Sequence, residues 1–182
     1  MENPKPDDTD ELVLEWAEAV PEIDPRVERV IDRLLINAKY LEQLAARLSE
    51  PHRLQLTDYE ILARLFWVGP PHRLRPTQLA RGTMAPPTTI TSRLDRLEKR
   101  GLLRRVPDPS DRRALTAELT DEGRELFRTI VAEQAKEEKA IFAELATEDL
   151  DALDGLLRRL MSVLEDHLGP APRRVTMALR DD

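Results

Sequence analysis

The chain has 182 residues, of which 35% are charged, 41% hydrophobic and 4% aromatic, and its formal net charge is −7. This length and composition favour one helix-rich domain, or one such domain with an extension. The absence of cysteine excludes disulfides, thiolate metal sites and cysteine nucleophiles. Three scattered histidines, an acidic N-terminus and short apolar runs predict a cytoplasmic protein with no metal ion, no cofactor and no membrane span.

The charge is distributed unevenly along the chain. Residues 1–23 contain one lysine and eight acidic residues, a balance of −7, whereas residues 71–113 contain eleven basic and four acidic residues, a balance of +7. Because phosphate contacts depend on local charge, an acidic protein with a basic segment still suits nucleic acid. The central segment is therefore the candidate site.

The first third of the chain predicts helices. Residues 1–10 are expected to form a disordered acidic arm. Residues 11–56 carry apolar side chains at helical spacing, interrupted at Pro21 and restarted by Asp24-Pro25. The second of these helices should span about 25 residues. A helix of that length in a small domain indicates either a brace between subunits or a scaffold.

Residues 57–119 have the element order of a winged helix-turn-helix, most clearly over roughly residues 74–119. Thr57 and Glu60 have the spacing of a capping box that opens a helix. A short helix follows Arg75-Pro76, and Pro86-Pro87 opens a longer one that runs to Arg100. Alternating segments around residues 102–106 and 114–119, with a turn between them, predict a hairpin. Helices over 120–168 and a tail over 169–182 complete a mostly α fold with a small β-hairpin wing.

Polar and basic residues of this segment are the candidate DNA contacts. A recognition helix needs a narrow polar outer face to enter the major groove, and an arginine-bearing hairpin tip suits the negative potential of a minor groove. The candidates lie on the two helices and the hairpin tip: Arg75, Thr77, Pro87, Thr88, Thr89, Thr91, Ser92, Arg96, Asp111, Arg112 and Arg113. For Arg112 and Arg113 the alternative is a solvated turn.

The segment RPTQLA…TSRLDRLEKRGLLRRVPDPSDRRALTAELTDEG closely resembles the MarR family of regulators. The resemblance is specific over about 50 residues. It implies a homodimer held by N- and C-terminal helices, two DNA-binding lobes, and a ligand pocket between. It also implies that Asp111 orients the wing arginines and that Arg113 enters the groove. Met84-Ala85-Pro86-Pro87 departs from the serine or threonine that often caps the family's recognition helix.

The segments EWAEAVPEID (15–24) and GPPHRLRP (69–76) look like the branch of this family that has an extra N-terminal helix, which includes urate-responsive regulators. The positions that match the ligand site of that branch are Trp16, Glu60, Trp67 and Arg93. Two of them differ in residue type from the branch, and one of its cations is lost, which argues against urate itself. The resemblance implies a small anion, aromatic or polycarboxylic, paired by Arg93.

Other functions are weighed against a ligand-responsive repressor. A constitutive or architectural DNA-binding dimer would have Trp16, Trp67 and Arg93 tightly packed, with no pocket between them. For Glu60 the alternative to a ligand contact is a helix cap. A protein-interaction module would use the acidic arm, but the intact basic wing argues against it. An enzyme is disfavoured, because the sequence shows no nucleophile–base pair, phosphate-binding glycine loop or metal cluster.

Overall fold

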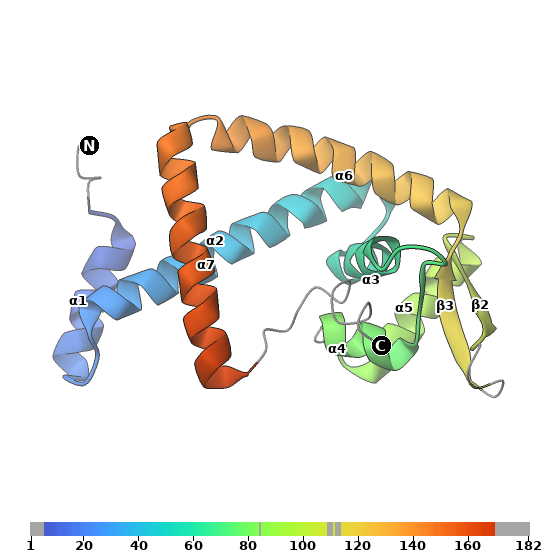
Figure 1. Cartoon of the computed structure of the whole chain (residues 1–182), viewed down its shortest axis with the longest axis horizontal. Helices are drawn as coiled ribbons and strands as arrows, with labels where there is room; N and C mark the ends of the chain where they lie inside the picture. The colour runs from blue at the N-terminus through green and yellow to red at the C-terminus, as the bar shows by residue number, and fades with distance from the viewer. Residues whose placement is uncertain (1–5, 84, 109–110, 112–113, 170–182) are drawn as a thin grey trace. The chain divides into compact units, whose positions relative to one another are not determined.

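The computed structural model describes residues 6–83, 85–108, 111 and 114–169, and it divides into two compact units, Met1–Ala45 and Ala46–Asp182. The described elements are mostly helices, with one small antiparallel sheet (Figure 1). This confirms the predicted fold class. Each unit is described below by itself.

The first unit contains α1 (Asp8–Ala19) and most of α2 (Pro25–Ser49). α1 begins inside the segment that we expected to be a disordered arm, so that expectation was wrong for residues 8–10. The reason is a capping box, in which the backbone amides of Asp7 and Asp10 each donate to the other's carboxylate, at 3.1 and 3.2 Å.

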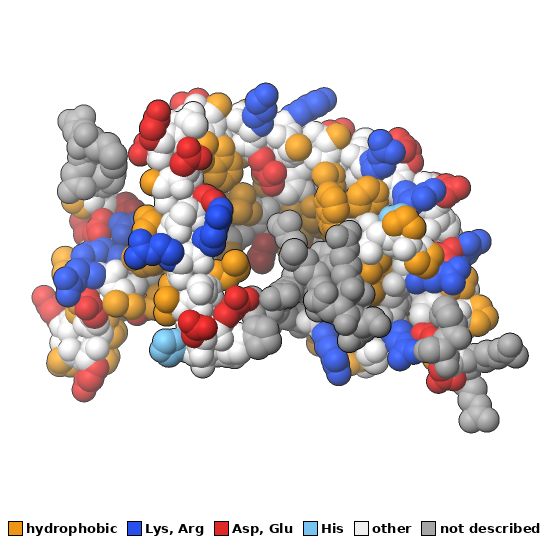
Figure 2. Space-filling view, in the orientation of Figure 1, with side chains coloured by type: hydrophobic (Ala, Val, Ile, Leu, Met, Phe, Trp, Pro, Cys, Tyr) orange, Lys and Arg blue, Asp and Glu red, His pale blue; other side chains and the backbone are white. Residues whose placement is uncertain are grey.

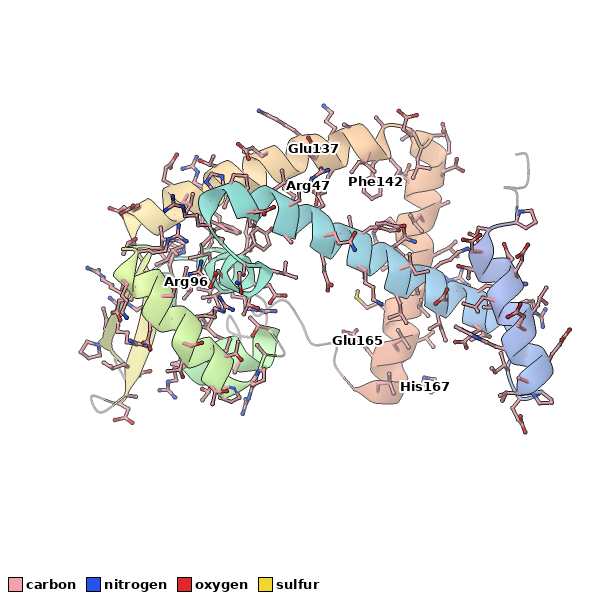
Figure 3. All side chains as sticks on the ribbon, turned by 180° about the vertical axis from the view of Figure 1, so that it is seen from behind. Arg47, Arg96, Glu137, Phe142, Glu165 and His167 are labelled. Carbon is pink, nitrogen blue, oxygen red and sulfur yellow. The ribbon has the colours of Figure 1, made fainter. Side chains whose placement is uncertain are left out.

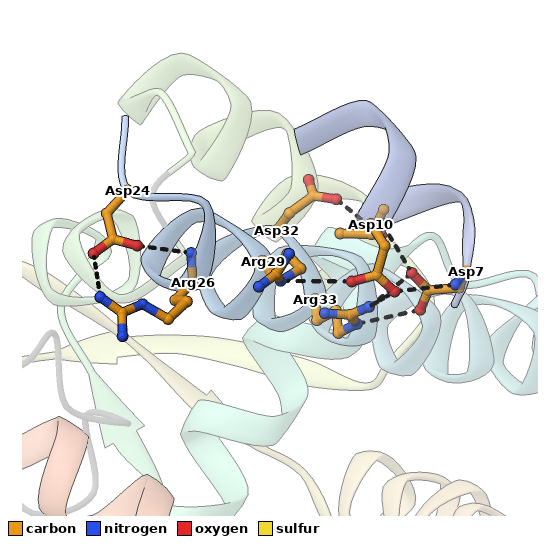
Figure 4. A network of polar contacts seen from close by, with 8 residues as sticks. Asp7, Asp10, Asp24, Arg26, Arg29, Asp32 and Arg33 are labelled. Carbon is orange, nitrogen blue, oxygen red and sulfur yellow. Dashed lines mark hydrogen bonds and ion pairs between the residues drawn. The ribbon is translucent and has the colours of Figure 1, made fainter. Parts of the chain in front are cut away.

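An ionic network fastens α1 to α2 (Figure 4). Arg33 pairs with both Asp7 and Asp10 at 2.8 Å, and Arg29 lies 3.5 Å from Asp10. The hydrogen bond from Arg33 holds the pKa of Asp7 below its ordinary value. The pair therefore persists above the ordinary carboxylate pKa and is lost as the pH falls through the lowered one. Beside it, Val13 is fully buried.

The second unit contains the end of α2, a 3₁₀ turn η1 (Glu50–His52), α3 (Leu56–Trp67), α4 (Pro76–Thr83) and α5 (Pro87–Lys99). Its sheet has the order β1-β3-β2, from β1 (Arg73–Leu74), β3 (Leu115–Leu119) and β2 (Leu103–Pro107). The predicted hairpin is confirmed as β2 and β3. We did not predict β1, because two residues are too few to show alternation.

Fully buried aliphatic side chains from α3, α4, α5 and the sheet form one core with two residues of α6 (Asp121–Phe142). Phe127 of α6 is fully buried and packs its ring near those of Tyr59 and Phe66, with ring centroids 5.5 and 5.1 Å away. Thr120 caps α6 as predicted, accepting from the amide of Gly123 at 3.1 Å. The core therefore holds α5, the sheet and α6 together.

α7 (Thr147–Leu168) closes the described chain and has no buried residue. Its large apolar side chains are 40–80% exposed: Leu153, Leu156, Leu157, Met161, Val163, Leu164 and Leu168. In α2, the side chains of Val27, Val30, Ile31, Leu35, Ile36, Tyr40 and Leu41 are likewise 37–65% exposed. Apolar faces of this extent in a folded chain indicate an interaction surface.

Candidate nucleic-acid interface

α5, the helix predicted to be the recognition helix, has one buried face and one exposed face. Ile90, Leu94 and Leu97 are at most 1% exposed and fix the helix on the core. Pro86 is its N-cap and Pro87 its first residue, so neither supplies an amide at this helix start. The predicted contacts Pro87, Thr88, Thr91 and Ser92 are exposed, and Thr89 is partly exposed. The structure therefore brings these predicted residues together at one surface.

Two hydroxyl groups of this surface are bonded within the helix. Thr91 Oγ1 donates to the carbonyl of Pro87 at 3.1 Å, and Ser92 Oγ donates to that of Thr89 at 2.9 Å. Their protons are thus engaged, and each hydroxyl oxygen retains lone pairs as acceptors. In this arrangement the helix offers acceptor oxygens and threonine methyl groups, which suit base-edge donors and thymine methyls.

α4 begins after the exposed Arg75 and carries the exposed Thr77, both predicted DNA contacts. Arg75 Nε donates to Asp108 Oδ2 at 2.6 Å, and the Asp108 side chain is 6% exposed. This hydrogen bond raises the pKa of the Arg75 guanidinium. Arg75 thus connects the start of α4 to the end of β2, a role that we did not predict.

The same aspartate organises the wing turn. Asp108 Oδ1 accepts from the amide of Asp111 at 3.2 Å, and the Asp108 amide donates to the carbonyl of Ala114 at 3.0 Å. Arg112 and Arg113 lie outside the described residues. The implied role of Asp111 in orienting them therefore stays a prediction, although Asp111 is exposed on the turn as that role requires.

A charged row crosses the three strands at the base of the wing. Glu118 of β3 is paired in register with Arg73 of β1 and Arg104 of β2. Its carboxylate accepts from both guanidinium groups, including Arg104 Nε at 2.8 Å. Burial raises the pKa of Glu118, but the two arginines outweigh it and lower the pKa overall. Figure 2 shows acidic and basic side chains together at the wing.

Arg96, the other predicted contact, faces the protein as well as solvent. Its Nη2 donates to the carbonyl of Arg53 at 2.9 Å, and its Nη1 lies 4.0 Å from Asp58 Oδ2. Figure 3 labels Arg96 among the side chains of the whole chain. Its side chain is 41% exposed. The structure thus places Arg96 at the edge of the exposed face, against the chain segment that precedes α3.

The candidate ligand residues lie in both units. Trp16 belongs to α1 of the first unit and is partly exposed, whereas Glu60, Trp67 and Arg93 belong to the second. Trp67 is 48% exposed and packs edge-on against Phe66, with centroids 5.1 Å apart. Trp67 is thus only partly packed. This exposure does not decide between a ligand contact and a packed residue, the two interpretations that the sequence left open.

Arg93 has a partner that we missed. Its Nη1 lies 3.8 Å from Oδ2 of Asp58, a fully buried carboxylate at the start of α3. Within the described residues, Arg93 Nε and Asp58 Oδ1 are buried without a hydrogen-bond partner. Such atoms are costly, so they mark this position for a further ligand or for strain.

The capping pattern explains the omission. We predicted that Thr57 caps α3 and that Glu60 completes a capping box, and this was wrong by two residues. The helix begins at Leu56, and Asp58 accepts from the amide of Gln55 at 3.0 Å. The sequence did contain a sign of this arrangement, because Asp58 follows the predicted cap and can complete a capping box that begins two residues earlier, at Gln55.

Within the described ranges, no three metal-ligating side chains come together, and no helix is long and apolar enough to cross a membrane.

The family model of the MarR family matches residues 54–115. The chain is 33% identical over 158 residues to the HTH-type transcriptional regulator PecS of Dickeya dadantii (strain 3937), an alignment that spans 87% of this chain and 93% of PecS.

Solved structures that are similar to this one include those of two regulators. Sco3205, a MarR family regulator of Streptomyces coelicolor solved in complex with DNA, is 30% identical and has a TM-score of 0.61, over 80% of this chain and 90% of that one. Wild-type MarR of E. coli has a TM-score of 0.64 over 77% and 98%, and at 21% identity it supports the fold alone. With the exposed face of α5, the wing and these relatives, this chain belongs to the MarR family of DNA-binding transcriptional regulators.

Proposed function

We propose that this regulator is a homodimeric repressor that leaves a pseudo-palindromic operator when a small anion binds near Arg93. The observation that carries the ligand part is the pair of the buried Asp58 with the partly exposed Arg93, in which each side chain retains a buried polar atom without a hydrogen-bond partner. An anion with an additional donor would satisfy Arg93 Nε and Asp58 Oδ1 together. The role of Trp16 stays a prediction from the family resemblance.

The dimer is supported by the apolar faces of α2 and α7, which a second copy would cover. Two copies would present two recognition helices, and their half-sites should lie about one helical turn, roughly 10 base pairs, apart. A ligand that favours another lobe spacing would then weaken binding by shifting the population of dimers.

The first test is fluorescence anisotropy of the purified protein on DNA from upstream of its own gene, with and without small anions that include urate and aconitate. Tight, competitor-resistant binding that one anion relieves supports the full proposal. Specific binding that no tested anion changes supports the second candidate, a constitutive DNA-binding dimer. The ion pair between Arg93 and Asp58 favours that candidate, because each charge already has a partner.

Replacing Arg113 with alanine should weaken operator binding by about 1–3 kcal/mol, roughly 5- to 150-fold, if its side chain enters a groove. The melting temperature and the dimer should be unchanged, because the substitution replaces none of the residues that form the described core. Anisotropy titrations check the affinity, and Lys136→Ala on α6 is a control that removes a charge elsewhere. Unchanged affinity would reject the wing assignment.

Replacing Arg93 with glutamine should reduce the ligand response at least tenfold in half-effective anion concentration, because a charge-assisted pair is lost. DNA titrations against the effective anion measure this. The exposed Lys99 lies on the same helix, so Lys99→Gln is the matched control. A normal response in the Arg93 variant would place the ligand elsewhere.

A further inference from the structure

Arg96 lies in the last turn of α5 and Arg100 is the C-cap residue of that helix, and both side chains bind the same short stretch of backbone. Arg96 Nη2 donates to the carbonyl oxygen of Arg53 at 2.9 Å, and Arg100 Nη1 donates to the same oxygen at 3.0 Å. Arg100 Nη2 also donates to the carbonyl of His52 at 2.8 Å. Three guanidinium hydrogen bonds therefore converge on two carbonyl groups.

Those carbonyls lie at the end of a helical run. α2 ends at Ser49, η1 follows directly, and Arg53 reverses the chain with φ of 54° while its amide bonds to the carbonyl of Glu50 at 2.8 Å. The last carbonyls of a helix lack intrahelical amide partners and carry partial negative charge. Cationic donors are the favoured partners there, and arginine supplies several in fixed geometry.

The next residues strengthen the same contact. The amide of Leu54 bonds back to Ser49 at 3.2 Å, and Leu54 is 4% exposed in the core. The carboxylate of Asp58, which is fully buried, lies 4.0 Å from the Arg96 guanidinium and offsets part of its positive charge. Residues 52–58 thus form the surface that one edge of α5 contacts.

We propose that Arg96 and Arg100 are positioning residues that clamp the recognition helix to the C-terminal end of α2 and η1. The clamp sets the angle at which α5 is presented to DNA, and a shift in the last turn of α2 is passed to α5 through it. This inference rests on DNA binding through α5. It assigns to Arg96 a structural task in place of a phosphate or guanine contact.

Clamping and phosphate binding predict different salt dependence. A cation that contacts phosphate contributes about 0.9 to the slope of log K against log salt concentration, and its removal lowers the slope by that amount. A clamping arginine contributes nothing to the slope, and its loss weakens binding equally at all salt concentrations. Lysine also distinguishes them, because its single ammonium preserves a phosphate contact but not a fork across two carbonyls.

The experiment titrates the full-length dimer with operator DNA at several salt concentrations, for the wild type, Arg100→Lys, Arg100→Met and the exposed neighbour Lys99→Met. We expect both Arg100 variants to lose about tenfold in affinity with an unchanged salt slope, since several charge-assisted bonds are lost. We also expect faster amide hydrogen exchange at residues 53–55 in both. Lys99→Met should leave that exchange unchanged.

Wild-type affinity in Arg100→Lys, together with a slope lowered by about 0.9 in Arg100→Met, would overturn the clamp in favour of a phosphate contact. Wild-type affinity in both variants would also overturn it. If Arg100→Met does not fold, Arg100→Lys decides alone by affinity and hydrogen exchange. Lack of specific binding by the wild type would count against the proposed operator, whereas the exchange measurement on free protein would still decide the clamp.

Discussion

Replacing Gly123 with alanine should lower the free energy of unfolding of the second unit by about 3 kcal/mol or more. This is the largest purely steric effect that we expect in the chain. A Cβ atom at this position would lie 2.0 Å from the carbonyl oxygen of Leu102 and 2.9 Å from Leu119 Cδ1. The first of these atoms is backbone, so relief requires moving the start of α6 away from the sheet. Urea unfolding followed by circular dichroism measures the loss.

A second glycine provides the control. Gly155 lies within α7, where an added Cβ would meet nothing within 4 Å. Gly155→Ala should therefore stabilise its helix by roughly 0.5–1 kcal/mol, because alanine loses less backbone entropy. Equal unfolding midpoints for the Gly123 variant and the wild type would show that α6 does not approach the β2 end this closely.

Replacing Leu157 and Leu164 of α7 with glutamate should convert the proposed dimer to monomers. The two side chains are 40% and 47% exposed in the single chain and are spaced by two helical turns on one face. Burying a leucine contributes about 1.5–3 kcal/mol, and a symmetric interface counts each leucine twice. Sedimentation velocity should show a dissociation constant raised at least 1,000-fold, with operator affinity reduced in parallel.

Arg159 is exposed and lies on a different face of α7 from Leu157 and Leu164. Arg159→Glu therefore introduces an acidic residue without changing the apolar face. It should leave the association state unchanged. A dimer that survives the double leucine substitution would show that the α7 face serves another purpose, and would leave α2 as the remaining candidate.

Much of the fold could be predicted from local signals. Pro86-Pro87 fixed the start of α5, and Ile90, Leu94 and Leu97 identified its buried face, because prolines and helical periodicity act within one element. β1 could not be predicted, since Arg73 and Leu74 become a strand only by pairing with β3, 43 or more residues later.

The candidate site was predictable to a similar degree. The exposed residues at the start of α5 follow from its amphipathic pattern. The partners of Arg75, Arg93 and Arg96 do not, because Asp108, Asp58 and the Arg53 carbonyl reach them only through tertiary packing. A sequence shows that an arginine is present, but the direction in which its long side chain turns depends on neighbours that are distant in the chain.

The small sheet has two open edges, and each is modified against unwanted pairing. β1 is only two residues long and carries Arg73, and β2 carries Arg104 and Arg105 before ending at Pro107. Short length, charge and proline are the features that prevent one sheet edge from adding to another. Neighbouring regulators crowded on adjacent operators would therefore present wings that do not join into a continuous sheet, and the chain gains resistance to aggregation from the residues that build its DNA-binding lobe.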